Sequence, residues 1–195
     1  MKKRDFLAAS AVGASMLPAH LLGQQTPKDL RTPGILTVTG VIGKGNRGAV
    51  DSALDQMMTK QKIAFSKAFV IDFAAITALA KVEIKPTLEY DNKSHTLAGP
   101  LLSDVVRAAD SPGEGTRLLL RATDGYNVMI SLVDAKKYRF IVATHLDGHP
   151  MPLGGLGPLW AMYDADRFSD MAAKPVNERF GLCPWGLYHI DVQHA

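Results

Sequence analysis

Residues 147–166 read DGHPMPLGGLGPLWAMYDAD, and we expect the rest of the chain to be organised around this stretch. It combines a turn, a run of glycines, two aromatic residues and several carboxylates. The glycines, among them Gly157, let the backbone approach a ligand closely, because a residue without Cβ adopts unusual conformations at little cost. The side chains best placed to contact a ligand are those of Trp160, Tyr163 and Asp164. Most Gly-Pro loops are plain connections, so this stretch alone leaves a binding site and an ordinary loop both open.

Two further features indicate how this stretch enters the fold. Asp147 and Gly148 are typical of a tight turn between two strands. Residues 159–163 are too apolar for a surface loop, which predicts that the chain enters the core there.

The patterns on either side predict short strands and short helices. Alternating or β-branched runs that predict strands cover residues 34–43, 82–90, 117–122, 127–132, 140–145 and 185–192. Helical spacing covers residues 53–58, 65–79, 101–109 and 134–138. Asp72 is a plausible cap for a helix at 72–80, and Pro86 places its strand at a sheet edge or a bulge. Strands mixed with a few short helices predict a single α+β domain with mixed β-sheets.

Composition excludes several classes of protein. The formal net charge is +3, but without residues 2–5 the remaining 19 basic and 18 acidic residues leave only +1. A near-neutral body offers no electrostatic attraction for nucleic acid. Cys183 is the single cysteine, so the chain has no internal disulfide and no cysteine-based zinc pattern. A lone buried cysteine usually behaves as an inert small hydrophobe.

The beginning of the chain predicts export to the periplasm. A basic start, KKR at residues 2–4, precedes an apolar, small-residue run at 6–22, which is the pattern of a cleaved signal peptide. The order Lys-Arg-Asp-Phe-Leu is similar to a twin-arginine signal with lysine for the first arginine, so twin-arginine export and general secretion both stay open. An uncleaved anchor is a further alternative, although the run is short for a membrane span. The expected division is a signal peptide at 1–25, a linker at 26–33 and a domain at 34–195.

Four stretches occur in an order that is typical of one family. They are LTVTGVIG (36–43), LAGPLLSDVV (97–106), DGYNVMISL (124–132) and THLDGHPMPLGGLGPLWAMYDAD (144–166). Together they resemble the small exported members of the sulfite oxidase family's molybdopterin-binding domain, over roughly residues 34–192. The resemblance implies a compact mixed α/β fold with a cleft that, in the enzymes of the family, holds a molybdenum atom on a pterin.

The chain departs from that family at two places. Catalytic members bind molybdenum through a cysteine thiolate in the middle of the domain, whereas residues 87–95 contain no cysteine. Trp160 follows Gly-Pro-Leu where enzymes of the family often carry an arginine, and an arginine clamps phosphate in a way that tryptophan cannot. Both departures remove what a metal-bearing, phosphorylated cofactor needs and keep what a plain pterin ring uses.

The resemblance therefore implies a pterin-binding site with no catalytic or metal-ligating residue assigned. A carboxylate, Asp164 or Asp124, would accept two hydrogen bonds from the N–H edge of a tetrahydropterin-like ring. Trp160, Tyr163 or Trp185 would cover the face of the ring, and such stacking is worth about 1–3 kcal/mol for the chemically similar nucleobases. On this basis Trp160→Ala is expected to weaken pterin binding and to leave the fold intact.

Several other residues have two interpretations. Asn46 and Arg47 follow the first predicted strand in a glycine-rich loop, and an asparagine at this place recurs in the family, but an Asn-stabilised turn explains them equally. The hydroxyl of Tyr126 could meet a ligand, or its ring could simply pack. His145 and His149 straddle a predicted turn, and two ligands without a third make a poor metal site.

Family members that lack the cysteine include pterin-binding regulators of membrane enzymes of cyclic-dinucleotide signalling. The resemblance thus implies a non-catalytic pterin-binding protein that signals ligand occupancy to a membrane-bound partner of cyclic-dinucleotide metabolism. The alternatives are a molybdopterin-dependent oxidoreductase and an interaction module that has lost all ligands. Neither a nucleophilic triad nor a phosphate-binding loop is recognisable, so hydrolysis has no support in the sequence.

Overall fold

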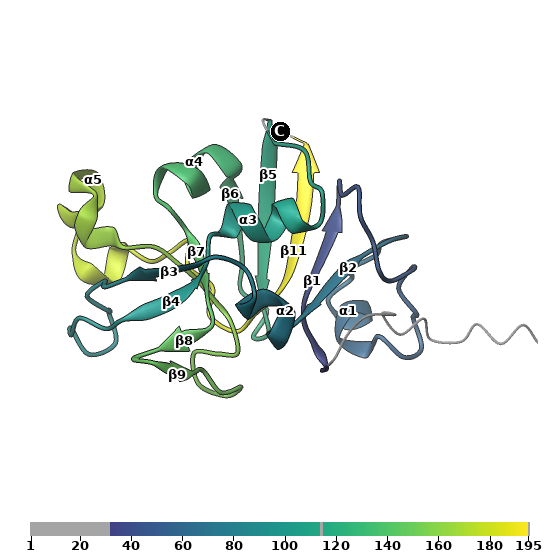
Figure 1. Ribbon diagram of the computed structural model, residues 1–195, viewed down its shortest axis with the longest axis horizontal. Coiled ribbons are helices and arrows are strands. Elements are labelled where there is room, and N and C mark those ends of the chain that lie inside the picture. Colours follow the sequence, from purple (N-terminus) through teal and green to yellow (C-terminus); the bar gives the residue numbers. More distant parts are fainter. Residues whose placement is uncertain (1–31, 114, 195) are drawn as a thin grey trace, which may run out of the picture.

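The computed structural model describes residues 32–113 and 115–194, and its largest sheet is built around the last strand. β11 (Leu187–His194) pairs in parallel with β1 (Gly34–Gly40) and antiparallel with β5 (Thr116–Ala122). β2 (Phe69–Asp72) and β6 (Asn127–Ser131) complete the order β2-β1-β11-β5-β6 (Figure 1). Buried positions alternate with more exposed ones along β5, as in a strand with one face on the core.

Two smaller sheets lie on the other side of the molecule from β1 and β2 (Figure 1). One has the order β3-β4-β8-β9 and is antiparallel throughout, and the other pairs β10 with β7. Their strands are β3 (Lys81–Ile84), β4 (Leu97–Pro100), β7 (Ile141–Ala143), β8 (His145–Leu146), β9 (His149–Pro150) and β10 (Trp160–Met162). The architecture is mixed α+β, with several sheets and few helices, as the sequence predicted at this coarse level.

The helices are short. They are α1 (Gln56–Lys60), α2 (Phe73–Thr77), α3 (Leu102–Ala108), α4 (Leu132–Lys137) and α5 (Ser169–Ala172), with the 3₁₀ turns η1 (Ala165–Arg167) and η2 (Val176–Glu178). The predicted cap is confirmed, because the Asp72 carboxylate accepts a hydrogen bond from the Ala75 N–H at the start of α2. The helix predicted over residues 65–79 is wrong in its first part, where the chain forms β2.

The stretch from 147 to 166 does enter the core. Asp147 and Gly148 both have positive φ, 48° and 82°, and close the two-residue hairpin between β8 and β9. All three residues of β10 are buried, and they pair with β7, which is buried as well. Residues 159–163 therefore form part of the main hydrophobic cluster.

The predicted signal peptide and nearly all of the predicted linker lie outside the described residues. Among the residues that the structure does describe, none belongs to a helix long and apolar enough to cross a membrane.

Candidate functional site

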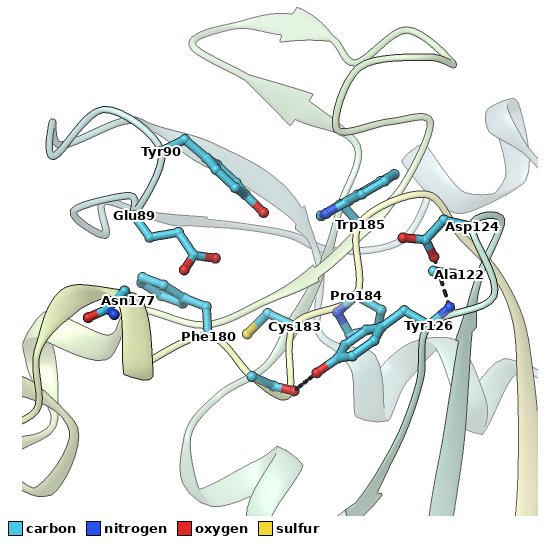
Figure 2. A pocket seen from close by; sticks show the side chains of 11 residues that line it. Glu89, Tyr90, Ala122, Asp124, Tyr126, Asn177, Phe180, Cys183, Pro184 and Trp185 are labelled. Carbon is cyan, nitrogen blue, oxygen red and sulfur yellow. Dashed lines mark hydrogen bonds between the residues drawn. The ribbon is translucent and has the colours of Figure 1, made fainter.

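A cavity of about 250 Å³ opens where three segments of the chain meet. The first follows β3, the second is the turn between β5 and β6, and the third precedes β11 (Figure 2). We call it the main cavity, and its lining residues are Glu89, Tyr90, Ala122, Asp124, Tyr126, Asn177, Phe180, Gly181, Cys183, Pro184 and Trp185. Its volume lies just below the roughly 300–1,000 Å³ of typical small-molecule pockets, which suits a compact ligand.

Aromatic rings form much of the wall of the main cavity. Figure 2 shows the Tyr90 hydroxyl directed towards the Trp185 side chain, on the opposite side of the opening from Tyr126. The Tyr126 hydroxyl donates a hydrogen bond to the Gly181 carbonyl at 2.8 Å and so ties the β5–β6 turn to the segment before β11. Burial and the charge of Glu89 raise the pKa of Tyr90, while a hydrogen bond with Trp185 opposes them.

The charged groups of the main cavity are hydrogen-bond acceptors. Glu89 and Asp124 contribute carboxylates, and no lysine, arginine or histidine lines the described wall. Asp124 Oδ1 accepts the Tyr126 N–H at 2.9 Å, which fixes that carboxylate in the turn. A wall of this kind attracts N–H donors and repels anions.

Cys183 also lines the main cavity, although no sequence pattern predicts a place for it there. Burial raises the pKa of its thiol well above the usual value, and the negative charge of Glu89 adds to the effect. The thiol is therefore held protonated, whereas nucleophiles and metal ligands need the thiolate.

Three of the residues predicted from the sequence come together at the main cavity: Asp124, Tyr126 and Trp185. Glu89, Tyr90 and Phe180 were not predicted. The segment 87–95, noted for its missing cysteine, in fact supplies the first two. Tyr90 stands between two acidic residues and Phe180 precedes a glycine, and neither setting is specific enough to predict a binding site.

Trp160 lies beneath the main cavity rather than in its wall. Its side chain is 1% exposed, its Nε1–H donates to the Cys183 carbonyl at 2.9 Å, and its ring centre lies 6.3 Å from that of Tyr90. This burial contradicts the expectation that Trp160→Ala leaves the fold intact, because truncating a buried tryptophan costs about 3–5 kcal/mol.

Tyr163 is a core residue as well. It is 1% exposed, stacks on Phe140 with ring centres 4.7 Å apart, and donates its hydroxyl proton to the Arg179 carbonyl at 2.6 Å. Its neighbour Asp164 lines a different, smaller cavity, together with Arg139 and others.

The remaining predicted residues have structural partners away from the main cavity. Asn46 exchanges two hydrogen bonds with the backbone of Val70, each 2.8 Å long. Arg47 pairs with Asp55 and lies over the ring of Phe65. A Cβ on Gly157 would lie 2.3 Å from the Met151 carbonyl oxygen, so only glycine fits there.

Within residues 32–113 and 115–194, no group of three or more His, Cys, Asp or Glu side chains is arranged to hold a metal ion. His145 and His149 flank the β8–β9 turn, but they are not opposite each other. His145 faces Pro150, and His149 faces Leu146.

The fold is similar to part of a known oxidoreductase. The sulfane dehydrogenase SoxCD from Paracoccus pantotrophus matches with a TM-score of 0.51 at 9% sequence identity, over 80% of this chain and 37% of that chain. This chain thus spans little more than a third of that protein's length. At such low identity the match shows a shared fold and nothing about activity.

No family model matches the chain, and no curated protein matches it. The fold and the main cavity together define an α+β protein with an acidic, aromatic-walled cavity.

Proposed function

We propose that this is a periplasmic pterin-binding protein of the sulfite oxidase fold, which does not catalyse turnover and signals ligand occupancy to a membrane-bound partner of cyclic-dinucleotide metabolism. The observation that carries the proposal is the wall of the main cavity, where aromatic rings surround two carboxylates. A pterin presents a flat face and a pyrimidine edge with adjacent N–H donors. This wall offers a chemical partner for each of them.

Glu89 and Asp124 are the candidate acceptors for the pyrimidine edge. Figure 2 shows them on opposite sides of the opening, with the Trp185 ring between the Tyr90 hydroxyl and Asp124. Either carboxylate can accept two parallel N–H bonds, while Trp185 or Tyr90 covers a face of the ring. Trp160 contributes from below by holding Tyr90 and the Cys183 backbone in place.

The charged side chains of the main cavity favour a pterin without phosphate. Molybdopterin carries a phosphate group, and phosphate sites in proteins are typically built from arginine, lysine or backbone N–H groups. Here the charged side chains of the wall are Glu89 and Asp124, which repel phosphate. A tetrahydropterin-like ring with an uncharged side chain meets no such penalty.

A molybdopterin-dependent oxidoreductase is the alternative function, and one observation favours it. Cys183 lines the main cavity, and thiolates are preferred ligands of soft metals. The raised pKa of the Cys183 thiol argues against this role, since the protonated form is a poor ligand.

Analysis of the native protein separates these functions. We expect protein purified from its own periplasm, denatured and extracted, to release a fluorescent pterin without stoichiometric molybdenum. Stoichiometric molybdenum would overturn the proposal in favour of the enzyme. If the extract contains no pterin and the protein binds no added pterin, both ligand-binding functions are refuted, and an interaction module without ligands is the remaining alternative.

A further inference from the structure

A second cavity, of about 150 Å³, is independent of the main cavity and shares none of its lining residues. It lies where the end of β3, the end of α4 and the start of η1 meet. Its lining residues are Ile84, Tyr138, Arg139, Asp164, Arg167 and Phe168. This space exceeds what a single water molecule needs.

Asp164 is the unusual residue of this second cavity. It is 7% exposed, and its Oδ2 accepts the backbone N–H of Lys85 at 3.2 Å. Its Oδ1 is buried and has no hydrogen-bond partner among the described residues. It precedes η1, yet its side chain caps none of the N–H groups of that turn. A buried carboxylate oxygen without a donor is costly, so its presence calls for an explanation.

Two arginines complete the polar wall. Arg139 and Arg167 are both exposed, and neither guanidinium takes part in an ion pair within the described part of the chain. Guanidinium groups bind carboxylates through paired N–H donors. Ile84 and Phe168 provide the apolar surface in the same cavity.

We propose that the second cavity binds a small zwitterion with an ammonium group and a carboxylate joined by a short aliphatic chain, as in an ω-amino acid. The ammonium donates to Asp164 Oδ1, and the ligand carboxylate is held by Arg139 and Arg167. The chain between them packs on Ile84 and Phe168. A simple cation is disfavoured by the two arginines and a simple anion by Asp164, because like charges at short range repel.

The test is a calorimetric and NMR titration of the full chain with glycine, β-alanine and 4-aminobutyrate, alongside butylamine and butyrate as single-charge controls. We expect at least one amino acid to bind ten times more tightly than either control. Its binding should shift the Lys85 amide signal, because that N–H contacts Asp164. Equal binding of butylamine, equal binding of butyrate, or no binding at all would overturn the proposal.

Variants locate the binding. Asp164→Asn and Arg167→Gln should each weaken the best amino acid at least tenfold, whereas Arg107→Gln, at an exposed arginine of α3, should leave the affinity unchanged. Arg167 is exposed, so its variant keeps the test valid if Asp164→Asn fails to fold. Unchanged affinity in a folded Arg167→Gln protein would refute the assigned site. No pterin enters this experiment, so its outcome is independent of the function proposed for the main cavity.

Discussion

Glu89 and Asp124 give the main cavity its chemical character, since they are the only charged side chains on its described wall. Asp124 is fixed in the turn by a hydrogen bond from the Tyr126 N–H. Glu89 is also close enough to Tyr90 and Cys183 for its charge to raise both of their pKa values. Its carboxylate therefore faces the space that a ligand would fill.

Glu89→Gln should weaken pterin binding by about tenfold, because the amide loses one acceptor and the charge that strengthens the hydrogen bonds. Fluorescence titration with tetrahydrobiopterin or its oxidised form measures the change. Glu83→Gln is the matched control, since Glu83 is exposed on β3 and forms an ion pair with Lys81, outside the wall of the main cavity. An equal loss in both variants would mean that Glu89 makes no direct contact.

The residues of the site were only partly predictable. Asp124, Tyr126 and Trp185 stood out because acidic and aromatic side chains lay beside turns. Glu89, Tyr90 and Cys183 did not, because they meet through contacts between segments far apart in sequence. Trp160 and Tyr163 attracted attention for their chemistry, but an apolar run such as 159–163 is equally the signature of a core strand.

At the scale of elements, Tyr163 links the walls of the two cavities. Its ring centre lies 6.1 Å from that of Phe180 in the main cavity, and 5.5 Å and 6.3 Å from those of Tyr138 and Phe168 in the second cavity. Its hydroxyl bond to Arg179 also anchors the connection formed by η1, α5 and η2.

Tyr163→Phe should lower the free energy of unfolding by about 1–3 kcal/mol, because the Arg179 carbonyl loses its buried donor. It should also speed hydrogen exchange in residues 167–181. Denaturant unfolding and exchange mass spectrometry measure the two effects. Tyr138→Phe is the control, as its hydroxyl bonds to an exposed Asp170. Equal effects in both variants would contradict the anchoring role of Tyr163.

Sequence patterns predicted most elements, and the exceptions have local causes. β4 was missed because Gly99 and Pro100 are signals of a turn, yet Gly99 is needed there: a Cβ would lie 2.0 Å from the Val142 carbonyl oxygen. The sequence of β2 predicts a helix instead of a strand, because its four residues continue an apolar run in which periodicity does not separate strand from helix.

At the scale of the whole molecule, His189 joins the three central strands of the largest sheet. It is fully buried on β11, and Arg121 of β5 donates to its Nδ1 at 3.0 Å. Because an arginine only donates, Nδ1 is the acceptor, and the Nε2–H donates to Thr39 of β1 at 2.9 Å. Burial, and then the charge of Arg121, lowers the pKa of His189 to about 4.

The folded protein should therefore lose stability in acid. Since the pKa of His189 is lower in the folded chain than in the unfolded one, the stabilisation is complete above about pH 6.5 and declines as the pH falls to about 4. The loss amounts to roughly 3 kcal/mol at most. His189→Gln should flatten that part of the stability profile, whereas His149→Gln, at an exposed position, should not. Chemical unfolding at a series of pH values measures the free energy of unfolding of each variant. Identical pH profiles for His189→Gln and His149→Gln would contradict the role assigned to His189.

The acidic wall of the main cavity makes the central claim testable with one matched pair of ligands. Isothermal titration of the purified chain with dihydroneopterin and with dihydroneopterin triphosphate compares the same ring with and without phosphate. We predict that the unphosphorylated pterin binds at least tenfold more tightly, since Glu89 and Asp124 repel phosphate. Equal or tighter binding of the triphosphate, or no binding of either compound, would contradict a site for a bare pterin ring.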